Sequence, residues 1–419
     1  MHYQLVKILM TIATRIFYRK IHFLNSDRIP ENGPAILIAN HPGSLMDAAL
    51  LGLLLKRPIH FFARGDIFKS SLISTILRAL HMHPVHHHLD GRSSLAANDQ
   101  SFETAIQLLK NGELVLFFPE GFSHIEHYLL PFKKGSFRLA FQTMEKAGLE
   151  SLPILPIGFH YSHPTSVFST VWIMAGEKIE TAAYYFNNED KPAQAIRKLC
   201  DAAYQAISAI TIQVDKPRAD LLFTILEVMR TEPAYQSMDT YKQWQCEKNI
   251  SIALNNYSEN QLFPVKAYQT ELKVSHLKEE WMVAAEKPSP NRWLHLLNWL
   301  LATPGFLIHG IPLLIAKWIA DNKVKRIDFY AWILVAAGAL IDLAWHFLLF
   351  ILIGSIMSYR FALLFLVVSL IAGRISLKIS PAIIQANRIA KGKKIPASTV
   401  QLMRVNRSKI RNELRAYLS

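Results

Sequence analysis

Compact apolar runs separated by helix-forming segments characterise the first 165 residues of this 419-residue chain. Four such runs, each bounded by turn-forming or polar residues, predict strands over residues 35–40, 59–63, 112–121 and 152–161. The last two follow segments with apolar residues at helical spacing, residues 98–112 and 138–148. Strands that alternate with helices favour an α/β sheet, and functional groups in such sheets lie outside the carboxyl ends of the strands.

A long apolar region towards the C-terminus predicts membrane helices. Residues 330–357 carry only Asp342 and His346 as ionisable side chains and exceed the ~20 residues needed to cross a bilayer. The next run, 361–373, is too short by itself, so residues back to Gly354 would be needed to complete a membrane hairpin. A buried helical core is the alternative. Because Asp342 and His346 are four positions apart, we expect a mutual hydrogen bond that faces the helix partner rather than a catalytic role.

Two other segments have interrupted or mixed apolar patterns. Residues 293–320 contain Pro304-Gly305 and Pro312, which favours a broken or interfacial helix pair over a straight membrane span. Near the N-terminus, apolar residues recur at helical spacing with basic residues on other faces: Leu5, Ile8, Leu9, Ile12 and Ile16. This second pattern is typical of a helix that lies at a membrane interface or packs on a domain, and it leaves both open.

Composition and charge favour an anionic membrane as the partner. Hydrophobic residues make up 51% and charged residues 19% of the chain, and the formal net charge is +14. A basic surface attracts nucleic acid or acidic lipid; the apolar segments select the membrane, and no nucleic-acid-binding module is visible. Cys200 and Cys246 lack CxxC spacing, which predicts free thiols in a reducing compartment.

A histidine and an aspartate follow the first predicted strand, in the sequence NHPGSLMD (40–47). On a continuous helix His41 and Asp47 would lie about 120° apart, but Pro42-Gly43 can turn the chain before a helix begins near Ser44, a residue suited to the N-cap. The carboxylate can then bind one imidazole nitrogen, fix the tautomer and leave the other nitrogen as a general base. A capping turn with an incidental histidine is the alternative, and this stretch alone favours neither.

A second polar motif, FFPEGFSH (117–124), follows the third predicted strand, and LLPFKKGSFRLA (129–140) comes shortly after it. Together they combine a Glu-Gly turn with several cations around a glycine. Such a set suits a phosphorylated alcohol, because cations bind the phosphate and a nearby base deprotonates the hydroxyl group.

In this order and spacing, the strings resemble the phospholipid/glycerol acyltransferase superfamily over about residues 30–165. The His–Asp pair, the Phe-Pro-Glu-Gly motif and a later proline-containing strand, here LPILPIG, carry the resemblance. It implies an α/β fold with a mixed sheet flanked by helices, an amphipathic N-terminal helix and a C-terminal helical membrane segment.

Two departures distinguish the chain from most members of that superfamily. Most have four residues between His and Asp and continue as Glu-Gly-Thr-Arg-Ser; here five separate the pair, and Phe122, Ser123 and His124 follow Glu-Gly. The arginine expected to hold phosphate is therefore absent. Both departures and the later Leu-x-Pro-x-Lys-x-Gly resemble the fungal-type glycerol-3-phosphate/dihydroxyacetone-phosphate acyltransferases and similar bacterial proteins.

The resemblance implies a role for each matched residue. His41 would be the general base and Asp47 its orienting partner. Acceptor-binding residues would come from the second motif and the segment after it: Glu120, Gly121, Ser123, His124, Lys133 and Arg138. The family's arginine after Pro-Val falls on His87, which leaves that role in doubt, with Arg92 and Arg64 as substitutes.

The histidine-rich run HMHPVHHHLDGR (81–92) permits another interpretation, a zinc site. Consecutive ligands at positions 86–88 would point in different directions, and no HExxH or CxxC spacing supports them. We therefore expect no metal site, and a solvated loop near the acceptor pocket instead.

These observations predict five parts. They are an amphipathic N-terminal helix (1–29), an acyltransferase catalytic domain (30–215), a helical accessory region (216–290), apolar membrane-associated or transmembrane segments (291–380) and a basic C-terminal tail (381–419).

The predicted activity is that of a membrane-bound O-acyltransferase in phospholipid biosynthesis, with its active site on the cytoplasmic face. It would move an acyl chain from acyl-CoA or acyl carrier protein to a hydroxyl group of glycerol 3-phosphate, and a lysophospholipid (1-acylglycerol 3-phosphate) is the alternative acceptor. No metal or redox cofactor is expected, and no Ser or Cys lies in a nucleophile elbow. An inactive membrane scaffold or lipid-binding module is the alternative of another class; the intact His41, Asp47 and Glu120 argue against it.

Overall fold

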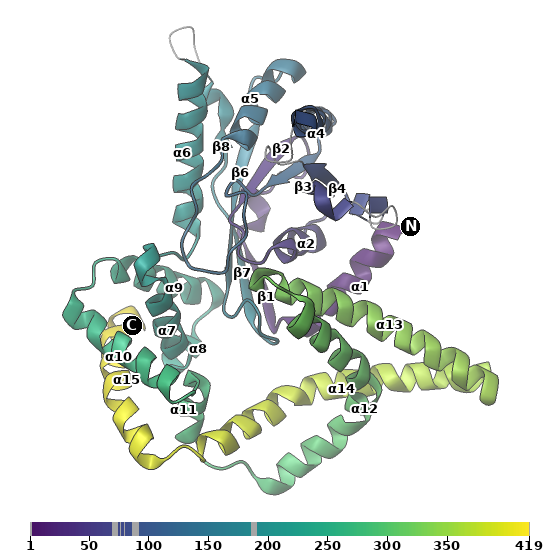
Figure 1. Cartoon of the computed structure of the whole chain (residues 1–419), viewed down its shortest axis with the longest axis vertical. Helices are drawn as coiled ribbons and strands as arrows, with labels where there is room; N and C mark the ends of the chain where they lie inside the picture. The colour runs from purple at the N-terminus through teal and green to yellow at the C-terminus, as the bar shows by residue number, and fades with distance from the viewer. Residues whose placement is uncertain are drawn as a thin grey trace. The chain divides into compact units, whose positions relative to one another are not determined.

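The structure, a computed structural model, describes the chain in two compact units (Figure 1). The described residues are 2–68, 74–75, 77–78, 80–85, 92–185 and 191–418. The sheet unit comprises residues 1–125, 129–212 and 325–332, and the helical unit comprises residues 126–128, 213–324 and 333–419.

A mixed sheet of eight described strands forms the centre of the sheet unit. The strands are β1 (Lys20–Leu24), β2 (Ala35–Ala39), β3 (Ile59–Arg64), β4 (Met82–Val85), β5 (Leu114–Phe117), β6 (Pro153–Tyr161), β7 (Thr170–Ala175) and β8 (Ile179–Glu180). Their order is β1-β7-β6-β2-β5-β3-β4, with β8 paired to β6. Neighbouring strands from β6 through β2, β5 and β3 to β4 are parallel, whereas β7 and β8 run antiparallel to β6. The mixed α/β sheet predicted from the sequence is confirmed.

Helices cover one face of this sheet. They are α4 (Arg92–Lys110), α5 (Gly135–Ala147) and α6 (Pro192–Ile210), whose buried apolar side chains share a core with Ile36 and Ile38 of β2. Leu37 points to the opposite face, because side chains alternate along a strand, and it is also fully buried. Burial on both faces explains why β2 reads as an unbroken apolar run. The predicted helices 98–112 and 138–148 correspond to α4 and α5.

The N-terminal helix α1 (His2–Phe17) leaves its apolar stripe exposed. Leu5, Ile8 and Ile12 are each more than half exposed, whereas Thr14 and Phe17 on the other side of the helix are buried. No described residue covers the stripe, which favours the membrane-interface interpretation over packing on the domain.

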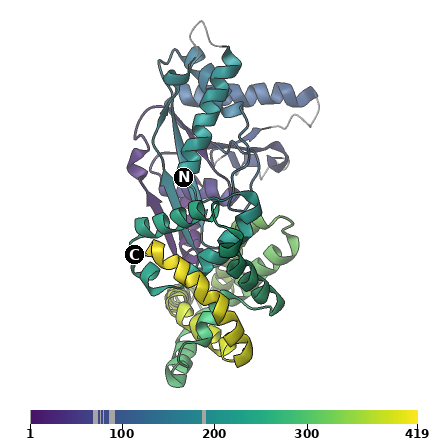
Figure 2. The ribbon, with the colours of Figure 1, turned by 90° about the vertical axis from the view of Figure 1, so that its left-hand side faces the viewer.

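The helical unit contains a bundle of shorter helices. It comprises α7 (Ala219–Arg230), α8 (Pro233–Ser237), α9 (Thr240–Leu254), α10 (Glu259–Val274), α11 (Glu279–Ala285) and the C-terminal α15 (Ala397–Leu418). Helix α15, drawn in yellow, lies beside α7, α9 and α10 (Figures 1 and 2). Its Arg407 is buried and pairs with Glu279 of α11 at 2.8 Å. Cys200 and Cys246 are unpaired and buried.

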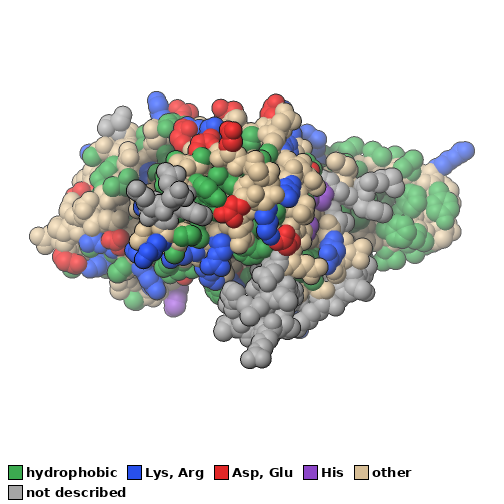
Figure 3. All heavy atoms as spheres, turned by 90° about the horizontal axis from the view of Figure 1, so that it is seen from above, with side chains coloured by type: hydrophobic (Ala, Val, Ile, Leu, Met, Phe, Trp, Pro, Cys, Tyr) green, Lys and Arg blue, Asp and Glu red, His purple; other side chains and the backbone are tan. Residues whose placement is uncertain are grey.

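Three helices are long and apolar enough to cross a membrane: α12 (Arg292–Lys323), α13 (Tyr330–Ile356) and α14 (Tyr359–Gly392). Hydrophobic side chains, green at the right-hand end of Figure 3, cover the end of the α13–α14 hairpin. Only 11% of the apolar window of α13 is buried, so the alternative of a buried helical core is wrong. Helix α14 reaches a spanning length because it continues past the predicted run 361–373 to Gly392.

The prediction of a broken or interfacial helix pair over residues 293–320 is wrong, because α12 continues through Pro304 and Pro312. Proline lacks the N–H that would bind the carbonyl oxygen of the residue four positions earlier. At Pro312 the freed carbonyl is that of Ile308, and it accepts a hydrogen bond from the indole of Trp345 on α13 at 3.0 Å. A neighbouring membrane helix thus replaces the lost backbone bond.

Small residues allow α12 and α14 to approach closely. Gly305 lies against Ala372 and Ser376, and Ser376 Oγ donates to the carbonyl oxygen of Ala302 at 2.7 Å. Such contacts are typical of helix packing in membranes, where the hydrophobic effect does not drive association.

The polar residues of α13 also face α12. His346 Nδ1 lies 2.8 Å from the carbonyl oxygen of Asp342 and 3.4 Å from its carboxylate. The nearer partner of the Asp342 carboxylate is His309 Nδ1 of α12, at 2.9 Å. The predicted proximity of Asp342 and His346 is confirmed, but the closest contact of His346 is the Asp342 backbone carbonyl, and the carboxylate binds His309 of α12, which the sequence pattern did not indicate.

Candidate active site

The sheet brings the two polar motifs together. β2 and β5 are parallel neighbours, with Ile38 opposite Phe117, so the residues that follow them meet at one edge of the sheet. Asn40 joins this edge to β6: its side-chain amide donates to the carbonyl oxygen of Phe159 at 2.9 Å, and its side-chain oxygen accepts from the N–H of Phe159 at 2.6 Å.

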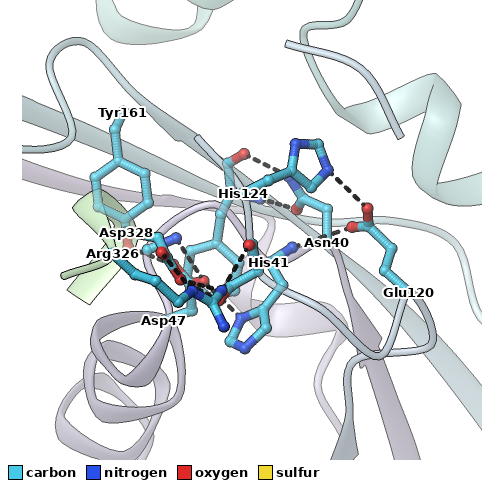
Figure 4. Close-up of polar contacts among 11 residues, drawn as sticks. Asn40, His41, Asp47, Glu120, His124, Tyr161, Arg326 and Asp328 are labelled. Carbon is cyan, nitrogen blue, oxygen red and sulfur yellow. Dashed lines mark hydrogen bonds and ion pairs between the residues drawn. The ribbon is translucent and has the colours of Figure 1, made fainter. Parts of the chain in front are cut away.

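His41 and Asp47 are in direct contact across the kinked connection (Figure 4). Imidazole Nδ1 lies 2.9 Å from Asp47 Oδ2, which also accepts the N–H of Gly43 at 2.8 Å. Ser44 occupies the N-cap of α2 (Leu45–Leu54) as predicted, but its side chain makes no cap bond and its φ is positive, 52°. Asp47 in the first turn of α2 reaches back instead, and this brings its carboxylate to His41.

Tyr161 completes the surroundings of Asp47. Its hydroxyl group donates to Asp47 Oδ1 at 2.5 Å. Burial raises the pKa of Asp47, while the hydrogen bonds from His41, Tyr161 and Gly43 act in the opposite direction. Burial and the Asp47 charge raise the pKa of Tyr161 well above its usual value, which keeps the hydroxyl protonated as a donor.

The other imidazole nitrogen of His41 is available for chemistry. Nε2 has no hydrogen-bond partner among the residues that the structure describes, and the side chain is 17% exposed. The ring stacks on Phe118 with centroids 3.7 Å apart and planes 16° apart. With Nδ1–H donated to Asp47, the geometry leaves the Nε2 lone pair as a proton acceptor in a fixed orientation.

Glu120 holds the two motifs together. Oε1 accepts the backbone N–H of His41 at 3.2 Å, and Oε2 accepts the N–H of Leu130 at 2.8 Å and lies 3.0 Å from His124 Nε2. The N–H of His124 in turn donates to the carbonyl oxygen of His41 at 3.1 Å. The Glu120 carboxylate is buried, and its contacts hold the backbone of His41 against the second motif.

Lys133 lies across Gly121. Gly121 has a φ of +68°, a backbone conformation that favours glycine. A Cβ atom there would be 2.6 Å from Lys133 Nζ, so the ammonium group lies beside the Glu-Gly turn. Arg138 is exposed on the first turn of α5, and no contact among the described residues brings its guanidinium to this turn.

The remaining predicted residues have different outcomes. Ser123 is buried and binds Arg326 and Asp328, two residues that sequence reasoning did not select. His87 lies outside the described residues. Arg92 begins α4 and Arg64 ends β3, and their side chains lie outside the described part of the structure.

The described part of the histidine-rich run lies at the β3–β4 edge. His60 Nδ1 lies 3.0 Å from His83 Nε2, and burial together with His81 and His83 lowers the pKa of His60 to about 4. Elsewhere among the described residues, one cluster has ligand types and spacing suited to a metal ion: His309, Asp342 and His346 in the helical unit. Neither group belongs to the His41 site.

Comparisons with known proteins match part of the chain to one family. Residues 20–160 match the family model described as Acyltransferase. The 1-acyl-sn-glycerol-3-phosphate acyltransferase of Bacillus subtilis is 31% identical over 143 residues, which cover 34% of this chain and 62% of that protein. Glycerol-3-phosphate O-acyltransferase 1 of Saccharomyces cerevisiae is 30% identical over 120 residues, 27% of this chain and 16% of that protein.

Similar proteins also occur in an alga and among solved structures. A 1-acyl-sn-glycerol-3-phosphate acyltransferase of Chlamydomonas reinhardtii is 29% identical over 47% of this chain and 54% of its own length. The structure of the LPA acyltransferase PlsC of Thermotoga maritima aligns with 48% of this chain and 79% of its own, at 21% identity and a TM-score of 0.35. The matched part of the chain spans about half to three fifths of the length of the first two curated relatives. Residues 20–160 therefore carry an acyltransferase-family domain, and the relatives it resembles are glycerolipid acyltransferases.

Proposed function

We propose that the chain is a membrane-bound O-acyltransferase that moves an acyl group from an acyl thioester, acyl-CoA or acyl carrier protein, to a hydroxyl group of glycerol 3-phosphate. The observation that carries the proposal is the 2.9 Å contact between His41 Nδ1 and the Asp47 carboxylate, with Nε2 left as a base. The names of the relatives, acyltransferases for glycerol 3-phosphate or its 1-acyl derivative, support this class of acceptor.

In the proposed reaction His41 Nε2 removes the proton of the acceptor hydroxyl group. The oxygen attacks the thioester carbonyl, and backbone N–H groups at a turn stabilise the oxyanion. When this intermediate collapses, the C–S bond breaks and the leaving thiolate receives the proton from the His41 imidazolium. Asp47 stabilises the imidazolium that forms between these steps. Every atom and proton is accounted for without a metal or redox cofactor.

The choice of acceptor has support on both sides. The Glu-Gly-x-Ser-His string and the lysine at position 133 favour glycerol 3-phosphate, by resemblance to the fungal-type enzymes. The relative from Bacillus subtilis favours 1-acylglycerol 3-phosphate as the second candidate. The two acceptors share a phosphate and differ in apolar volume, so a panel of both with one acyl donor separates them.

The proposed location is the cytoplasmic face of an anionic membrane. The three long apolar helices support membrane association. Basic residues at the end of α12 and just after it, Lys323, Lys325 and Arg326, support a cytoplasmic position for that helix end.

The experiment is a transfer assay with the purified full chain in lipid nanodiscs. Radiolabelled glycerol 3-phosphate with acyl-CoA or acyl carrier protein should give a labelled acyl product, and His41→Ala should lower the rate by about 10²–10⁴-fold. Asp47→Asn keeps the side-chain shape but should also lower the rate, because an amide cannot stabilise the imidazolium. Absence of transfer by the wild-type protein with either donor and either acceptor would favour the inactive scaffold.

A further inference from the structure

A short segment from the C-terminal half of the chain belongs to the sheet unit. Residues 325–332 connect α12 to α13, yet they group with the sheet unit. Within that unit Arg326 and Asp328 contact Ser123, more than 200 positions earlier in the chain. The linker between two candidate membrane helices therefore contacts the second motif, FFPEGFSH (117–124).

The contacts fix one edge of the Arg326 guanidinium. Nη2 lies 2.7 Å from Asp328 Oδ2 and Nε lies 3.2 Å from Oδ1, a two-point pairing with one carboxylate. Nη2 also donates to the carbonyl oxygen and to Oγ of Ser123, both at 3.0 Å, and Ser123 Oγ–H donates to Asp328 Oδ2. Because Asp328 is only 6% exposed, this arrangement is held from the buried side.

The opposite edge of the guanidinium is open. Nη1 has no hydrogen-bond partner among the described residues, and the Arg326 side chain is 36% exposed. The Phe122 ring lies 4.2 Å and the Phe329 ring 5.1 Å from the guanidinium carbon. A guanidinium held by a carboxylate and two rings presents its remaining N–H groups in a fixed direction, so little side-chain entropy is lost when an oxyanion binds.

The Arg326 guanidinium binds Ser123, and the next residue, His124, contacts His41. Ser123 precedes His124, whose N–H donates to the carbonyl oxygen of His41, and Figure 4 draws these residues together with Arg326 and Asp328. In the same turn, the Lys133 side chain lies against Gly121. The turn from Glu120 to His124 therefore has a cation from each of two distant segments.

We propose that Arg326 binds the phosphate group of the acceptor, with Asp328 and Ser123 as the positioning residues that orient its guanidinium. The inference rests on the proposed acyl transfer and adds a binding residue to that site. In the resembling superfamily an arginine stands at the position of Ser123; here a guanidinium reaches this position from residue 326. The acceptor site would then be complete only when the α12–α13 linker is in place.

The test compares an acceptor with a phosphate and one without. Wild type, Arg326→Ala, Arg326→Lys and the double variant Arg326→Ala/Asp328→Ala are assayed in nanodiscs with glycerol 3-phosphate and with glycerol. The double variant avoids leaving a buried carboxylate without its partner. Lys325→Ala, an exposed neighbour with the same charge, is the control for general attraction of anions.

Loss of a charge-assisted hydrogen bond predicts that the KM for glycerol 3-phosphate rises about 10- to 100-fold in Arg326→Ala and in the double variant. The KM of the acyl donor and transfer to glycerol should stay near wild type, Arg326→Lys should fall between, and Lys325→Ala should match wild type. An equal loss of transfer rate with glycerol 3-phosphate and with glycerol would overturn the proposal, because it would mean that Arg326 only stabilises the local structure.

If the wild type transfers to neither acceptor, the proposed function fails by itself. Titration of glycerol 3-phosphate followed by ³¹P NMR then decides the inference: it requires binding by the wild type that Arg326→Ala weakens, and no binding or equal binding overturns it.

Discussion

The hydroxyl group of Tyr161 lies 2.5 Å from Oδ1 of Asp47, the carboxylate oxygen that does not bind His41. Tyr161 is the last residue of β6, two strands away from β5 in the sheet and on the other side of β2. Both oxygen atoms of the buried carboxylate thus accept hydrogen bonds, and its position depends on the sheet as well as on the local turn.

Tyr161→Phe removes one of the donors that oppose the effect of burial on Asp47. We expect the pKa of Asp47 to rise further, since the hydrogen bond from Tyr161 lowers it. A higher pKa of Asp47 favours its protonated form, so the acid limb of the rate–pH profile should move to higher pH. Activity should fall about tenfold below that limb's midpoint and less at high pH.

The measurement is transfer rate against pH for wild type and Tyr161→Phe. Tyr184→Phe is a control, because this tyrosine lies outside the site. An unchanged acid limb in Tyr161→Phe would mean that the Asp47–His41 pair does not set the profile.

Gly43 is needed because its neighbours leave no room for a side chain. A Cβ atom there would lie 2.6 Å from Asp47 Oδ1 and 2.7 Å from the Tyr161 hydroxyl oxygen. We expect Gly43→Ala to displace Asp47 from His41, with at least about tenfold loss of activity and a cost of about 1–3 kcal/mol in unfolding free energy from overpacking. Thermal unfolding and transfer rate in the same detergent measure both.

Gly52→Ala is the matched control for this substitution. Gly52 lies in the same helix that carries Asp47, and nothing lies within 4 Å of the position of an added Cβ atom. Because alanine is the better helix former, this variant should be as active as wild type and slightly more stable. Equal losses in both variants would contradict the steric explanation for Gly43.

Lys133 should act on the phosphate of the acceptor. Its ammonium group lies over Gly121, beside the turn that braces His41. We expect Lys133→Ala to raise the KM of the acceptor about tenfold or more and to change the KM of the acyl donor much less. Lys134→Ala is the control, since this exposed neighbour occupies the N-cap of α5. Similar changes for both substrates in Lys133→Ala would count against a phosphate role.

The contact between Trp345 and the Ile308 carbonyl predicts a coupled pair of substitutions. Trp345→Phe removes the indole donor and should cost about 1 kcal/mol, seen as a lower Tm in detergent. Pro312→Ala restores a backbone N–H that can bind the same carbonyl. In the Pro312→Ala background, Trp345→Phe should therefore cost less, and strictly additive effects on Tm would show that the two groups do not share this acceptor.

Local sequence patterns were sufficient for the central strands and for the first members of the site. β2, β3, β5 and β6 are compact apolar runs because parallel central strands are buried on both faces. The motif residues then follow from chain order: His41 comes just after β2 and Glu120 just after β5, its parallel neighbour, so the two motifs meet. Strands β1, β4, β7 and β8 were not predicted; β4 contains Pro84, which is tolerated there because the strand lies at the edge of the sheet.

Other members of the site were decided by contacts between distant segments. Tyr161 was placed at the end of a predicted strand, but only its contact with Asp47 gives it a role. The sequence around Arg326 does not indicate a role in the site, because a basic residue between two apolar runs is typical of the flank of a membrane helix. The continuity of α12 likewise depends on Trp345 of another helix, which supplies the hydrogen bond that Pro312 removes. The sequence by itself determined the central sheet and the apolar helices, because these follow from local periodicity and chain order. Its stretch NHPGSLMD left the contact between His41 and Asp47 open, and only the family resemblance favoured it. That contact, the donors around Asp47, the cation beside Ser123 and the unbroken α12 depend on how the chain folds back on itself or on partners distant in the sequence, and these only the tertiary structure decided.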